Sequence, residues 1–180
     1  NTVSRKKTGY QLGFKLFNLF GIQNLFIQGE FNKVRPYTYS QPDGNQHYSY
    51  YNQPITHPLG ANFKEWVRIL SYSYKDFFIE CKLNLADLGA DTDSLNYGQN
   101  IFNTDILNMP NESNSGFLEG TPVKIKHQFI KFGYLFNPKT NLQVYFGLSQ
   151  RTVTGLPEAK NSKYLFFGIR TALFNEYYDF

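Results

Sequence analysis

The chain has 180 residues, enough to bury the core of one domain, and Phe, Tyr and Trp make up 18% of it. The single cysteine, Cys81, excludes an internal disulfide framework and a zinc site built on cysteines, and no apolar run approaches the roughly 18 residues of a membrane-spanning helix. The net charge is +4, yet 83–123 holds six acidic residues and no Lys or Arg, so the rest carries +10. Such separation predicts electrostatically distinct surfaces.

The amino-terminal segment NTVSRKKTGY is polar and basic. It contains neither an initiator methionine nor a signal peptide. We therefore expect a mature fragment whose preceding part is missing.

From Gly9 onward, apolar and polar residues alternate, which predicts a half-buried strand. The same period recurs along the chain, while no long stretch shows a convincing helical period, and the many aromatic rings favour strands. The pattern predicts an all-β chain of about seven strands, most of them longer than the usual strand of soluble sheets. The expected strands are 9–17, 25–35, 63–74, 77–88, 123–136, 142–151 and 164–174.

The connections between these strands alternate in length. Short turns are expected at 21–23, 75–76 and 137–141, and longer loops at 36–62, 89–122 and 152–163. All long loops would then lie at one end of the sheet, an asymmetry typical of transmembrane barrels. We predict an antiparallel up-and-down transmembrane β-barrel, with the apolar faces toward lipid and the polar faces toward a lumen. The alternative is a soluble β-sandwich or lipocalin-like barrel with its apolar face inward.

Two strands are ambiguous about which face they present. Arg68 shares a face with Trp66 and Leu70, and Lys124 and Lys126 are expected above the membrane. Seven strands do not close a bacterial barrel, because single-chain barrels there have even strand numbers and no open edge survives in lipid. We therefore expect residues 1–180 to be the C-terminal part of one larger barrel, completed by preceding strands or by partner chains.

Three segments resemble a known family: LFIQGEFNKVRPYTYS, YNQPITHPLGANFKEW and the final FFGIRTALFNEYYDF. They are similar to the C-terminal part of the capsule-assembly Wzi-like outer-membrane barrels, and most of all to the gliding-motility RemB-like members of Bacteroidota. The resemblance implies a bacterial outer-membrane protein that handles surface polysaccharide (capsule) or serves motility, without enzymatic activity. Its partners would be outer-membrane lipid, the barrel-assembly machinery, surface polysaccharide and other outer-membrane proteins. Tyr178 and Phe180 resemble the C-terminal assembly signal of such barrels.

The best external binding candidates are Arg35, Tyr37, Tyr39 and His57. Aromatic rings stack on sugars, and an arginine can bind a uronate or phosphate through two hydrogen bonds. Alternatively, the prolines and glycine around these residues simply fix the shape of a long loop.

A second candidate region is the lumen, where five cations are expected to point inward: Lys15, Lys82, Lys131, Arg151 and Arg170. A basic lumen would favour anions. The alternative is an ion-pair network with Glu30 and Glu80.

Catalytic and metal-binding patterns are weak, and neither a cofactor nor nucleic-acid binding is predicted. Asp91 and Asp93 form a D-x-D pair but lack the rest of an EF-hand loop, which favours a solvated acidic loop. His127 is expected diagonally near Ser149, without a carboxylate to orient it. Cys81 is expected to face lipid.

Overall fold

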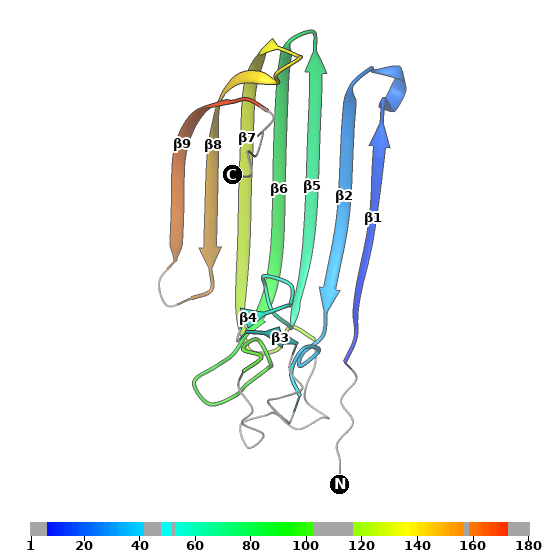
Figure 1. Cartoon of the computed structure of the whole chain (residues 1–180). Coiled ribbons are helices and arrows are strands. Elements are labelled where there is room, and N and C mark those ends of the chain that lie inside the picture. Colours follow the sequence, from blue (N-terminus) through cyan, green and yellow to red (C-terminus); the bar gives the residue numbers. More distant parts are fainter. Residues whose placement is uncertain (1–6, 42–47, 52, 103–116, 157–158, 173–180) are drawn as a thin grey trace, which may run out of the picture.

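The computed structural model describes residues 7–41, 48–51, 53–102, 117–156 and 159–172. These residues form one antiparallel seven-stranded sheet in which each strand pairs with its neighbours along the chain, in the order β1-β2-β5-β6-β7-β8-β9 (Figure 1). The strands are β1 (Gly9–Phe17), β2 (Leu25–Val34), β5 (Phe63–Tyr74), β6 (Phe77–Ala90), β7 (Thr121–Asn137), β8 (Leu142–Thr154) and β9 (Lys160–Arg170). The all-β prediction is confirmed. In the described part of the chain, no helix is long and apolar enough to cross a membrane.

Short elements occupy two of the connections. A 3-10 turn, η1 (Leu19–Gly21), joins β1 to β2. A small hairpin of β3 (Ser49–Tyr50) and β4 (Gln53–Pro54) lies within the connection from β2 to β5. Neither element was predicted, because both are shorter than a recognisable hydrophobic period.

The predicted asymmetry of the connections is confirmed for the two longest of them, the β2–β5 and β6–β7 connections. In Figure 1 the β2–β5 and β6–β7 connections and the β3–β4 hairpin gather at one end of the sheet, where β8 and β9 are also joined, and the other turns lie at the opposite end. We call these the loop end and the turn end. In the described residues β1 and β9 do not pair with each other, so the sheet is open here.

One predicted loop is wrong in its extent. The segment 152–163 was expected to be irregular, but β8 continues to Thr154 and β9 already begins at Lys160, with Thr152 opposite Asn161. β9 also ends at Arg170, before the predicted 174. The first residues of β9 are polar and do not alternate with apolar residues, so the sequence pattern does not predict a strand there. Their backbones nevertheless pair with β8.

The register separates the sheet into two faces, because successive side chains on a strand point to opposite sides. The apolar face takes its rows from pairs such as Leu12↔Phe31, Phe31↔Trp66 and Trp66↔Leu85. This pairing settles the ambiguous strand, since it places Trp66, Leu70 and Arg68 all on the apolar face. The polar face comprises the residues in between, among them Lys15, Gln28, Glu30, Glu65, Lys82, Asn84, His127 and Ser149.

The core of the described chain lies at the loop end of the polar face, where the long connections fold over the sheet. Its buried apolar side chains come from five strands and from the segment just before β5. Phe63 and Ala61 are fully buried at its centre. The cluster comprises Val34, Ala61, Phe63, Ala86, Leu88, Val123 and Val153. Among the described residues nothing comparable covers the apolar face, and Leu165 and Phe167 on it are 82% and 88% exposed.

Candidate functional site

The β2–β5 and β6–β7 connections fold over the loop end of the polar face, and we call them the cover. Asn62, which is fully buried directly before β5, holds the cover in place. Its side-chain amide donates to the carbonyls of Gly89 and Glu119 at 2.7 and 2.8 Å, and its Oδ1 accepts from the Leu118 N–H at 2.8 Å. Its backbone is left-handed, with φ of 59°, a conformation that asparagine tolerates better than most residues. One side chain therefore ties the β2–β5 connection to the β6–β7 connection.

Tyr37 makes a second tie between the same two connections. Its hydroxyl donates to the carbonyl of Asn96, and the residue is 2% exposed. Gly98 lies against the Tyr37 backbone and has φ of 82°, so a side chain there would collide with Tyr37. Tyr37 consequently packs between the connections and offers no ring face to solvent.

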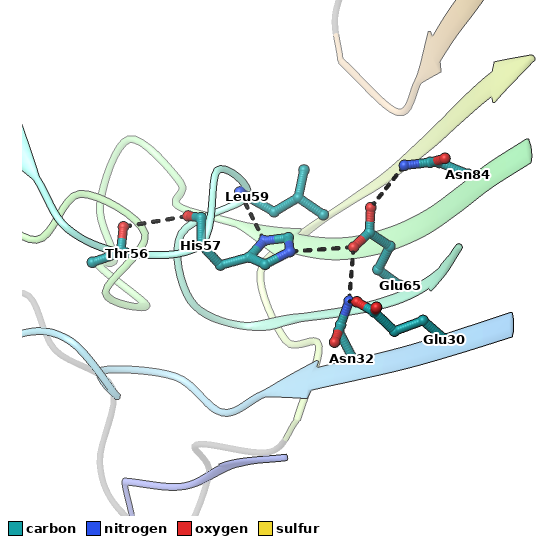
Figure 2. A network of polar contacts seen from close by, with 7 residues as sticks. All are labelled: Glu30, Asn32, Thr56, His57, Leu59, Glu65 and Asn84. Atoms are coloured by element: carbon teal, nitrogen blue, oxygen red, sulfur yellow. Dashed lines mark hydrogen bonds and ion pairs between the residues drawn. The ribbon is translucent and has the colours of Figure 1, made fainter. Parts of the chain in front are cut away.

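His57 joins this cover to the sheet through a polar network around Glu65 (Figure 2). The His57 Nε2 lies 3.2 Å from Glu65 Oε2, while the amide of Asn32 donates to that same oxygen at 3.1 Å. Asn84 donates to Glu65 Oε1 at 3.3 Å, and Asn32 also donates to Glu30. The His57 ring stacks on Phe63 at 4.4 Å, so the network continues into the apolar core.

The hydrogen bonds of His57 favour one tautomer of its ring. Its Nδ1 accepts the Leu59 N–H at 3.2 Å, which requires that nitrogen to be unprotonated. The ring proton therefore resides on Nε2 and is donated to Glu65. Hydrogen bonding from His57 lowers the pKa of Glu65, which lies at the loop end of β5, and desolvation offsets part of this effect.

A cleft of about 560 Å³ opens beside this network, between the segment around His57 and the residues that follow Gly98. Its walls combine amide groups, an aromatic ring, a histidine and an arginine. These are Gln99, Asn100, Phe102, His57 and Arg151. Such a mixture can hydrogen-bond hydroxyls and stack against a sugar ring, and the arginine can bind an anionic group.

The four predicted loop residues have different surroundings. His57 lines the cleft, and Tyr37 is buried between the connections. Tyr39 packs against the core cluster, with its ring 5.9 Å from that of Tyr48. Arg35 is partly buried, and its Nε has no hydrogen-bond partner among the described residues. The contacts of these four residues thus hold the long connection in place. Their role in glycan binding stays a prediction.

All five predicted lumen cations lie on the polar face, but they are spread along it. Lys131 pairs with Glu80 at 2.6 Å. Lys15, Lys82, Arg151 and Arg170 form no ion pair with any described residue. Of these five cations, Lys131 alone is thus ion-paired with a described residue.

His127 and Ser149 meet on the polar face as expected, with Nε2 and Oγ 3.0 Å apart. Ser149 is only 1% exposed, because it is covered by its neighbours, so its hydroxyl is inaccessible to a substrate. The pair therefore resembles a satisfied hydrogen bond more than a nucleophile and its base.

Asp91 of the D-x-D pair has a structural role, since it accepts the Tyr97 N–H at 2.7 Å. Among the described residues, no group of three or more His, Cys, Asp or Glu is arranged to hold a metal ion. Tyr178 and Phe180 lie outside the described residues.

The apolar face carries a pattern that alternation within single strands does not reveal. Leu16 is the last apolar residue of this face on β1, and Leu165 is the first on β9. The register nevertheless places both in one row across the sheet: Leu16, Ile27, Leu70, Cys81, Ile130, Leu148 and Leu165. The apolar zone therefore runs diagonally across the sheet and shifts toward the turn end from β1 to β9.

Sequence reasoning missed Asn62, Glu65 and the amide-rich wall of the cleft. Isolated polar residues carry no spacing signal, and the partners of Asn62 lie 27 to 57 residues away along the chain. Comparisons of this chain with protein-family models, curated proteins and solved structures gave no match.

Proposed function

We propose that this chain forms part of the wall of a β-barrel in a bacterial outer membrane. The apolar face lies against lipid, and the polar face borders the lumen. The barrel serves the attachment or assembly of surface polysaccharide, or gliding motility, without catalysing a reaction. Lipid, the barrel-assembly machinery, polysaccharide and other outer-membrane proteins are its partners.

The diagonal apolar zone is the observation that carries the membrane part of this proposal. The loop-end boundary of the zone runs from Tyr10 on β1 to Leu165 on β9, three rows further toward the turns. Three rows are about 20 Å along the strands, and six strand spacings are about 29 Å. A horizontal boundary then requires a strand tilt of about 35°, within the range of transmembrane barrels.

The position of the cover supports the same orientation of the sheet. In a soluble sheet, connections and neighbouring elements would bury the apolar face. Here they bury the loop end of the polar face, around Phe63 and Asn62, and leave Leu12 and Ile169 on the apolar face 68% and 71% exposed. An exposed apolar surface of this extent marks contact with a partner or a membrane.

The polysaccharide part rests on two features. The first is the resemblance of 25–40, 51–66 and 166–180 to the Wzi-like and RemB-like barrels. The second is the cleft at the loop end, whose wall of amides, Phe102 and Arg151 suits an anionic sugar chain. Because the long connections face outward in this orientation, the cleft would open toward the cell surface.

Fractionation of cells that make the natural full-length protein tests the proposal first. The account predicts an outer-membrane protein whose mobility on a gel changes with boiling, as that of closed barrels does. A soluble protein without heat-dependent mobility would contradict the membrane proposal. Binding of surface polysaccharide purified from the same cells should then weaken several-fold in Arg151→Ala, while Lys139→Ala, at the turn end, should bind like the wild type.

A transport barrel is the second candidate, favoured by the cations on the polar face that form no ion pair with a described residue, Lys82 and Arg151 among them. Single-channel recordings distinguish the two functions. Large anion-selective conductance that falls in Lys82→Gln favours transport, whereas a closed lumen favours the polysaccharide role.

A further inference from the structure

Cations lie along the loop-end boundary of the diagonal apolar zone. On β2, β5 and β9, the first apolar-face position beyond the zone is a lysine: Lys33 follows Phe31, Lys64 precedes Trp66 and Lys163 precedes Leu165. On β7 the zone begins at Ile130, and Gln128 is followed toward the loop end by two more lysines. We call this set the basic belt; its members are Lys33, Lys64, Lys124, Lys126 and Lys163.

Little negative charge balances the belt. Asp87 is the one acidic residue at the loop end of the apolar face in the described strands, and it pairs with Lys64 at 3.1 Å. Lys33 is placed over the ring of Phe117 at 4.0 Å. Lys124, Lys126 and Lys163 are exposed and form no ion pair or hydrogen bond with a described residue. These three cations therefore form no ion pair within the described chain, and Asp87, which lies opposite Lys124, pairs with Lys64 instead.

The turn end of the same face is different. Its boundary residues are Tyr74, Phe77 and Tyr134. The β5–β6 and β7–β8 turns contribute two lysines and one aspartate: Lys75, Lys139 and Asp76. The excess of positive charge is thus larger at the loop-end edge of the apolar zone, where the five lysines of the belt face one aspartate, Asp87. Lysines that served solubility alone would be expected in similar numbers at both edges.

A shallow groove of about 930 Å³ adjoins the belt on the zone side and crosses six strands. Where it crosses β7 and β8, its loop-end wall is formed by Gln128 and Gln150. On β2 and β5 that wall is formed by Phe31 and Trp66, with Arg68 in the next row, and the rest is mostly apolar, for example Leu70 and Ile130. On β7 a cationic group, an amide and an apolar side chain follow one another toward the turn end: Lys126, Gln128 and Ile130. The head, the linkage region and the acyl chains of a lipid follow the same order.

We propose that the basic belt binds the phosphate groups of an anionic lipid in the leaflet at the loop end, with the acyl chains lying over the groove. This inference rests on the proposed membrane orientation. Lys126 and Lys163 are two strands and one row apart, about 12 Å between backbones, so one head group with two phosphates can contact both long side chains. Arg68 extends toward the same level, since its guanidinium lies 5.9 Å from the Trp66 ring, and long cationic side chains reach in this way from the apolar zone to the interface.

The test uses the full-length protein folded into phosphatidylcholine vesicles that contain a small fraction of diphosphoryl lipid A. Its enrichment around the protein is measured by quenching from a labelled lipid. Dephosphorylated lipid A with the same chains is the matched lipid control. The variant is Lys124→Gln, Lys126→Gln and Lys163→Gln together. The matched protein control is Lys15→Gln, Lys139→Gln and Lys160→Gln, which removes the same charge from the polar face and the turn end.

We expect the belt variant to bind diphosphoryl lipid A roughly 10- to 100-fold more weakly than the wild type, because each lysine near an anionic surface contributes a factor of about five. The control variant should bind within about two-fold of the wild type, and dephosphorylated lipid should not distinguish the proteins. Added salt should reduce the difference.

Three results would overturn the inference. Equal enrichment of the phosphorylated and dephosphorylated lipids would show that phosphate is not recognised. Complete displacement by millimolar inorganic phosphate would indicate a site for free anions. A protein that does not insert into the phosphatidylcholine vesicles at all would refute the membrane proposal along with this one, whereas insertion without phosphate dependence would refute only the lipid site.

Discussion

The two faces of this sheet have similar strands and opposite surroundings. At the loop end of the polar face, Asn62, Tyr37 and His57 hold the connections over a buried core. The apolar face carries larger and more numerous hydrophobic side chains, yet nothing in the described chain covers it. Hydrophobicity alone therefore does not locate the interior of this protein. The cover shows where the chain supplies its own packing, and the diagonal zone shows where we propose that lipid supplies it.

The largest expected effect concerns the core beneath the cover. Phe63→Ala removes a fully buried ring and should lower the free energy of unfolding by about 3–5 kcal/mol. Denaturant unfolding of the protein in vesicles measures this loss. Phe20→Ala, in the 90% exposed ring of η1, is the control and should change it by less than about 1 kcal/mol. Equal losses in both variants would show that the cover is not an independent core.

Arginine substitutions at two adjacent residues of β5 compare the surroundings of the two faces directly. Leu70 lies on the apolar face and Ile69 on the polar face. Leu70→Arg should cost about 2–4 kcal/mol of folding into vesicles, because it sets a charge against lipid near mid-membrane. Ile69→Arg should cost much less, since a lumen can hydrate the charge. The folded fraction on unboiled gels measures both, and the reverse order would mean that the two faces have been exchanged.

Removing the hydrogen bonds of Asn62 should lower the free energy of unfolding by less than removing the Phe63 ring. Asn62→Ala leaves two carbonyls and one N–H without their partner, a loss of about 2–3 kcal/mol. Hydrogen exchange should accelerate in 89–90 and 118–121 and stay unchanged in the β8–β9 pair. Uniform acceleration across the sheet would contradict a local role.

The smallest expected effect is the change in the stability of the cover with pH. The pKa of Glu65 is lowered in the folded protein, so its contribution is complete above the ordinary titration range of glutamate and is lost as the pH falls through the folded-state pKa. Glu65→Gln should therefore remove about 1 kcal/mol at neutral pH and flatten the acid dependence of proteolysis in 53–62. An unchanged acid profile in this variant would exclude Glu65 as its source.

Much of the fold could be predicted because it depends on local alternation. Every predicted strand is present, and β1 and β5 have the predicted bounds. The start of β9 was missed because Lys160 and Asn161 are paired but polar. The facing of β5 could not be decided from Arg68 and Trp66 within one strand, since only the register with β2 and β6 reveals it.

The candidate site was less predictable than the fold. The meeting of His127 and Ser149 follows from hairpin register, which the sequence largely determines. The contact between His57 and Glu65, and the ties made by Asn62, depend on how long connections fold back over the sheet. Sequence spacing carries no information about those contacts.

The orientation of the two faces is most directly tested by nitroxide spin labels placed one at a time from 144 to 148 on β8 of the full-length protein in vesicles. Lipid-soluble oxygen and a water-soluble nickel chelate report the surroundings of each label. The account predicts high oxygen access at Val144, Phe146 and Leu148, and low oxygen access at Tyr145 and Gly147. Absence of this alternation, or oxygen access at Tyr145 and Gly147 instead, would contradict the claim that the apolar face meets lipid.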